Sequence, residues 1–202
     1  MKRIVLAGLL AGVALFAWES VAHMLLPLGD TGIKALSNEQ AVLAALKENV
    51  REPGFYFFPA PEDRPGMTGQ QKQEAMAQVQ ERWRTGPAGI MVFHPNGTAA
   101  TFPRQLITQF GCDLVAMLLV AILMSKLAPA GYIERAALVA VIGLFPTLQV
   151  ELPIWNWYGF PTAYMLSQAF VHLAGFCVGG AVLAKVIRPA AAPKPARQLS
   201  AA

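Results

Sequence analysis

The chain has 202 residues, of which 55% are hydrophobic and only 14% are charged. A soluble domain has about 25% charged residues, so much of this surface should face something other than water. The net charge is +4, and the basic residues flank apolar segments instead of forming a stripe, which predicts a lipid-bilayer environment and no nucleic-acid partner.

The first apolar run, residues 4–28, is long enough to cross a bilayer as a helix, which takes about 20 apolar residues. A signal peptide is the alternative, because Lys2 and Arg3 precede the apolar core and Ser20-Val21-Ala22 offers a cleavage site before His23. The apolar character continues through Leu26. We therefore expect a retained helix, although the sequence leaves cleavage of residues 1–22 open.

Residues 29–103 form a polar segment that we expect to fold as a small α+β cap. Two helix starts are predicted by capping-box spacing, at residues 37–40 and 68–71. Two strands are predicted by short apolar runs, at residues 54–59 and 89–95, and a turn at Pro95-Asn96-Gly97 predicts that residues 98–102 return as a hairpin arm. Such a cap has little core of its own and should rest on the outer ends of the bundle.

Three further apolar runs complete the predicted membrane spans, at residues 106–127, 133–154 and 162–187. Pro146 predicts a kink in the third helix. The last segment, residues 189–202, is rich in alanine and proline and should be a disordered cytoplasmic tail. The predicted fold class is a membrane all-α protein: a four-transmembrane-helix bundle (residues 1–28 and 104–188) with an extracytoplasmic α+β cap between helices 1 and 2.

The orientation follows from the short flanks of these runs. Basic residues cluster before the first run, around the second connection and after the fourth run: Lys2, Arg3, Lys126, Arg135, Lys185, Arg188, Lys194 and Arg197. The connection at residues 155–161 is aromatic and uncharged. Because cytoplasmic loops carry the excess of lysine and arginine, we expect both termini in the cytoplasm and residues 29–103 and 155–161 outside the bacterial inner membrane.

Each predicted helix carries two polar residues spaced four apart, which places both on one face. The pairs are Glu19 with His23, Gln109 with Asp113, Thr147 with Glu151, and Gln168 with His172. Ionisable groups in a bilayer are costly and therefore suggest function. We expect a polar cavity in the outer half of the bundle, with these ligand or proton-relay candidates: Glu19, His23, Gln109, Asp113, Glu151, Gln168 and His172.

The inner half of the bundle should be tightly packed. Gly8-xxx-Gly12 and Gly175-xxx-Gly179 match the small-residue spacing that allows close helix approach, and we expect it between the first and fourth helices. Cys112 and Cys177 fall inside apolar runs at different depths, so we expect apolar core thiols and no disulfide.

These features favour an integral-membrane binding or accessory protein and not an enzyme, with a membrane-protein partner or a second copy as candidate partners. One alternative is a metal- or haem-binding redox protein that uses Glu19, His23, Asp113 and His172 as ligands. Another is a small proton-coupled transporter with the same groups as relays. A polar bundle interior can also fix helix register without any ligand.

Several short motifs carry a resemblance to a group of bacterial proteins. They are Trp18 with His23-Met24, Pro27-Leu28-Gly29, Gly32-Ile33-Lys34 and the stretch 55–59. At these positions the chain resembles uncharacterised four-helix proteins of the bacterial inner membrane. The resemblance covers the first helix and the cap, implies the same fold, and carries no activity or site residue with it.

Overall fold

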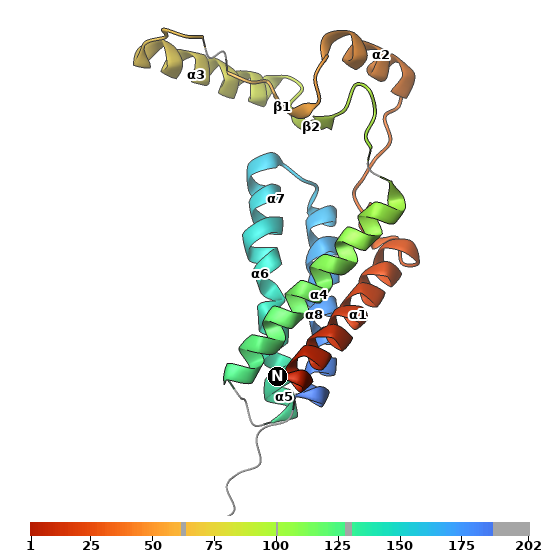
Figure 1. Cartoon of the computed structure of the whole chain (residues 1–202). Coiled ribbons are helices and arrows are strands. Elements are labelled where there is room, and N and C mark those ends of the chain that lie inside the picture. The colour runs from red at the N-terminus through yellow and green to blue at the C-terminus, as the bar shows by residue number, and fades with distance from the viewer. Residues whose placement is uncertain (62–63, 100, 128–130, 188–202) are drawn as a thin grey trace, which may run out of the picture.

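A computed structural model describes residues 1–61, 64–99, 101–127 and 131–187 (Figure 1). The chain is mostly helical, and it combines four long apolar helices with one small two-stranded sheet. The tail predicted at residues 189–202 lies outside the described residues.

The four predicted long helices are confirmed, and each is long and apolar enough to cross a membrane. They are α1 (Lys2–Met24), α4 (Phe102–Leu127), a composite third helix over residues 132–158, and α8 (Thr162–Val186). Figure 1 shows the start of α1 and the end of α8 at the same end of the bundle, with the sheet beyond the opposite end. We call the end nearest the sheet the cap end and the other the far end.

The third helix is built from consecutive pieces and is longer than predicted. The pieces are α5 (Tyr132–Ile142), α6 (Leu144–Pro146), the π-helical turn η2 (Thr147–Glu151) and α7 (Leu152–Tyr158). Proline disrupts the regular helical hydrogen bonding around it, and here the wider π turn directly follows Pro146. Residues 155–158, expected in a connection, instead continue the helix, and the chain turns at Gly159, whose φ of 69° suits glycine.

Glycine-mediated packing holds the far half of the bundle together, but with partners that differ from the prediction. A Cβ at Gly12 would lie 2.8 Å from Leu114 Cα, and one at Gly8 would lie 2.8 Å from Leu118 Cα, so the glycines of α1 face α4 and not α8. On α8 the two glycines differ: a Cβ at Gly175 would lie 2.6 Å from Leu15 Cδ1 of α1, as predicted, whereas one at Gly179 would lie 2.9 Å from Met117 Sδ of α4. The spacing shows that a helix packs closely but does not identify its partner.

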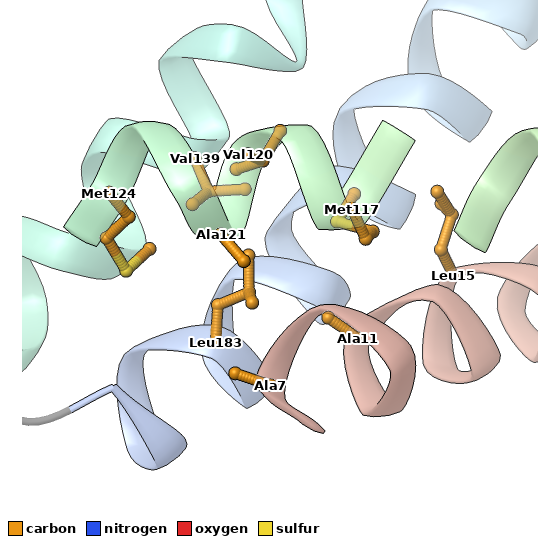
Figure 2. Close-up of a cluster of buried hydrophobic side chains, with 9 residues drawn as sticks. All are labelled: Ala7, Ala11, Leu15, Met117, Val120, Ala121, Met124, Val139 and Leu183. Atoms are coloured by element: carbon orange, nitrogen blue, oxygen red, sulfur yellow. The ribbon is translucent and has the colours of Figure 1, made fainter. Parts of the chain in front are cut away.

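A buried apolar cluster fills the space between these helices (Figure 2). Its members come from α1, α4, α5 and α8: Ala7, Ala11, Leu15, Met117, Val120, Ala121, Met124, Val139 and Leu183. The core of the molecule therefore lies in the far half and the middle of the bundle.

The cap contains a short 3₁₀ turn, two helices and two strands: η1 (Leu28–Asp30), α2 (Glu39–Asn49), β1 (Gly54–Phe58), α3 (Gly69–Thr85) and β2 (Gly89–Phe93). The strands are antiparallel, with Gly54 opposite Phe93. The capping box at Thr68 is confirmed, whereas α2 is capped by Asn38 and not by Ser37.

The predicted hairpin arm is wrong, because residues 98, 99 and 101 carry no strand. The chain turns at Gly97 and α4 begins at Phe102, with Pro103 in its first turn, where proline suits a helix start.

Aromatic rings connect the cap to the bundle. Tyr158, at the end of α7, meets the rings of Phe55 and Phe57 of β1 at centroid distances of 6.2 and 6.1 Å. Phe57 in turn stacks on Trp83 of α3 at 4.7 Å, and Trp83 Nε1 donates to the Pro59 carbonyl. Helix α2 has no buried residue. The aromatic cluster is thus one place at which the cap contacts the bundle.

Candidate ligand cavity at the cap end of the bundle

A cavity of about 400 Å³ lies between α1, α4 and α8 at the cap end. Its polar lining groups are Glu19, Ser20, His23, Gln109, Gln168 and His172. Its apolar walls are Phe16, Met24, Phe102, Leu106 and Val171. This size and this mixture, apolar walls with a few placed polar groups, are typical of small-molecule sites.

A carboxyl pair bridged by an amide forms one side of the site. Gln109 Nε2 donates to Glu19 Oε2 and to Asp113 Oδ1, each at 2.8 Å. Glu19 is half-buried and lines the cavity, whereas Asp113 is 4% exposed and lies behind Gln109. A single side-chain amide therefore uses both of its hydrogens to hold two carboxyl groups from different helices.

A second polar contact joins the wall of the cavity formed by α8 to the third helix. His172 Nε2 lies 3.3 Å from Glu151 Oε1, and Glu151 is only 5% exposed. Glu151 is the last residue of the π turn, so the irregularity after Pro146 ends at the group that contacts the cavity histidine. π turns of this kind are frequent at functional sites.

Buried oxygen atoms without a hydrogen-bond partner accompany both contacts. Within the described part of the chain they are Asp113 Oδ2, Glu151 Oε2 and Thr147 Oγ1. Buried polar groups are normally satisfied, so each of these oxygens has capacity for a further donor.

The backbone at the cap end holds the cavity residues in place. Ser167 Oγ donates to the Leu28 carbonyl at 2.8 Å and Trp18 Nε1 donates to the Val171 carbonyl at 2.9 Å, which ties α8 to η1 and α1. A Cβ at Gly29 would collide with the His23 ring in its present orientation, so the glycine leaves room for this ring beside η1.

The seven predicted site residues fall into two groups. Five line the cavity: Glu19, His23, Gln109, Gln168 and His172. Asp113 and Glu151 do not line it but contact lining residues. Counting 1.5 Å per residue from the cap ends of their helices, the carboxyl groups lie from roughly 7 Å (Glu19) to roughly 17 Å (Asp113) deep.

Sequence reasoning missed the apolar walls and Ser20. The part contributed by α1 could have been predicted from the sequence. Its residues Phe16, Ser20 and Met24 recur with the helical spacing that puts them on the same face as Glu19 and His23. The walls contributed by α4 and α8 depend on the angles at which the helices pack, which the spacing within one helix does not reveal.

Among the described residues, no three histidine, cysteine, aspartate or glutamate side chains are grouped so as to hold a metal ion. Below the polar layer lies the buried apolar cluster around Ala11, Met117 and Leu183.

No protein-family model, curated protein or solved structure matches this chain.

Proposed function

We propose that this chain is an integral membrane protein that binds one lipid-like, amphiphilic molecule in the cavity between α1, α4 and α8. The observation that carries the proposal is the cavity itself, about 400 Å³ with apolar walls and a carboxyl group held by Gln109. An apolar body would pack against Phe16 and Leu106, and a polar head would bond to Glu19.

The bilayer placement rests on the charges at the two ends of the bundle. Five basic residues lie at or near the far ends of their helices: Lys2, Arg3, Lys126, Arg135 and Lys185. The short cap-end connection at residues 159–161 carries no charge. By the positive-inside rule this distribution supports a cytoplasmic far end, with both termini in the cytoplasm and the cap outside, in the bacterial inner membrane that we propose.

In this orientation the cavity belongs to the outer half of the bilayer. The protein would take up or present an amphiphile on the extracytoplasmic side, as a binding or accessory protein, without transferring the molecule across the apolar far half. A partner membrane protein, or a second copy, would receive or supply the molecule.

A cavity-filling variant tests the proposal. Ser20 lines the cavity, so Ser20→Phe should occupy much of it, whereas Ala17→Phe adds the same ring to an exposed position on the same helix. Lipid extracts of the purified wild-type protein and the Ala17→Phe variant should contain an amphiphile in near-stoichiometric amount by mass spectrometry, and the Ser20→Phe extract should lack it. Equal amphiphile content in all three folded proteins would overturn the proposal.

A further inference from the structure

We infer that the head group of the bound amphiphile is a cationic amine, and this inference rests on the proposed function of the cavity. Three carboxyl groups belong to the cavity or to the layer directly behind it: Glu19, Asp113 and Glu151. No lysine or arginine lines the cavity among the described residues. Arg104 lines a separate hollow with Gln105 and Thr108, although this hollow also reaches Gln109.

The hydrogen-bonding balance of the site favours a donor as its ligand. Among the described residues, the buried side-chain atoms without a partner are oxygens of Asp113, Glu151 and Thr147, none of which lines the cavity. The carboxyl group that a ligand would meet directly is therefore that of Glu19. Gln109 has already used both amide hydrogens on Glu19 and Asp113, so it has none left for a ligand. A protonated primary amine brings up to three donors and a positive charge.

The remaining polar groups leave an anionic head group without a strong partner. His172 is engaged with Glu151, and the His23 ring packs against Gly29. Gln168 is the one other amide on the lining, and it carries no charge. A carboxylate or phosphate head would meet Glu19 without an opposing lysine or arginine, and like charges at short range in a low-dielectric site repel strongly.

The apolar walls specify the rest of the ligand. Phe16, Met24, Phe102, Leu106 and Val171 present hydrocarbon surface to the cavity. A free inorganic cation would leave this surface unused, whereas an alkyl chain joined to the amine would cover it. The ligand class is therefore an alkylamine or an amine-bearing lipid, with its nitrogen at Glu19.

The test uses three probes that share one chain and differ in head group: dodecylamine, dodecanol and dodecanoate. Binding to the full-length protein in nanodiscs of zwitterionic lipid is followed by the shift in thermal unfolding with probe concentration. Wild-type protein should bind dodecylamine at least tenfold more tightly than either other probe. Glu19→Gln should remove this preference, whereas Glu48→Gln, the same change on the exposed face of α2, should retain it.

The outcomes separate the two proposals. Equal binding of all three probes, tighter binding of dodecanoate, or an undiminished amine preference in Glu19→Gln would overturn the amine assignment. Binding of none of the probes would also overturn it, and the Ser20→Phe extraction then decides independently whether the cavity holds any ligand. If Glu19→Gln does not fold, the wild-type head-group preference and its loss in Ser20→Phe still decide the question.

Discussion

Gln109 Nε2 lies 2.8 Å from Glu19 Oε2, and this hydrogen bond joins α4 to α1 at the wall of the cavity. The same amide nitrogen donates to Asp113, so Gln109 holds two carboxyl groups at once. Replacing one uncharged side chain would leave both carboxyl groups without their donor. Gln109 is therefore the residue on which the polar side of the cavity depends most.

Gln109→Leu should lower the free energy of unfolding by about 1–2 kcal/mol, because it removes two hydrogen bonds and leaves carboxyl oxygens unpaired. The measurement is the loss of helical circular dichroism as sodium dodecyl sulfate is titrated into mixed micelles. Gln105→Leu is the matched control, since Gln105 is exposed one turn closer to the cap end. If Gln109→Leu and Gln105→Leu have the same free energy of unfolding, the hydrogen bonds of Gln109 do not stabilise the bundle.

The contact between His172 and Glu151 should appear as an energetic coupling between α8 and the π turn. In a double-mutant cycle of His172→Phe and Glu151→Leu, we expect a coupling of about 0.5–1.5 kcal/mol. Glu134 lies at the start of α5, at the far end. His172→Phe combined with Glu134→Gln should therefore be additive. A cycle that closes to zero for His172 and Glu151 would contradict the 3.3 Å contact.

Close packing of α1 on α4 predicts opposite effects for two Gly→Ala substitutions. At Gly12 the new methyl group would lie 2.8 Å from Leu114 Cα, which is backbone and cannot move aside alone, so a loss of about 1–3 kcal/mol is expected. At Gly111 the new methyl group would meet no neighbour within 4 Å beyond the adjoining helix backbone, and the helix should gain up to about 1 kcal/mol. The same titration measures both, and equal effects would argue against the packing.

Tyr158 should control the attachment of the cap. Tyr158→Ala removes the ring contacts to Phe55 and Phe57, each worth about 0.5–1.5 kcal/mol. The amides of β1 and β2 should then exchange faster with deuterium, while the unfolding midpoint of the bundle stays unchanged. Trp157→Ala removes a ring that is 73% exposed and should leave the exchange rates as they are. Unchanged exchange in Tyr158→Ala would show that the cap is held elsewhere.

The four long helices were predictable because hydrophobic length has a direct physical cause: a bilayer-spanning helix must be apolar over its whole length. The third helix shows the limit of this signal. The aromatic residues Trp155 and Tyr158 are compatible both with an interfacial connection and with the end of a helix. The structure shows that the helix continues through them and that the chain turns at Gly159. The absent arm at residues 98–102 has a similar origin, because a turn signal does not show that a strand follows it.

The candidate site was predictable in part for a comparable reason. Spacing of four residues puts Glu19 with His23, and Gln168 with His172, on common faces, and the cost of polar groups in a bilayer predicts that such faces meet. Which groups then touch depends on the rotation of each helix. For this reason the sequence did not reveal that Gln109 bridges Glu19 and Asp113, or that Gly12 packs on α4 and not on α8.

If the proposed function is right, the cavity at the cap end of the membrane-spanning bundle is reached from the cap side. The most direct measurement is thiol labelling of a Ser20→Cys variant in sealed right-side-out and inside-out vesicles. Cys112 and Cys177 are replaced by alanine in this variant, because both are exposed and do not lie in the core as predicted. A membrane-impermeant maleimide should label the introduced thiol only from the cap side, and Ala11→Cys, in the buried cluster, should stay unlabelled from either side. Labelling of the Ser20→Cys variant from the far side, or its complete protection until the protein is unfolded, would contradict the account.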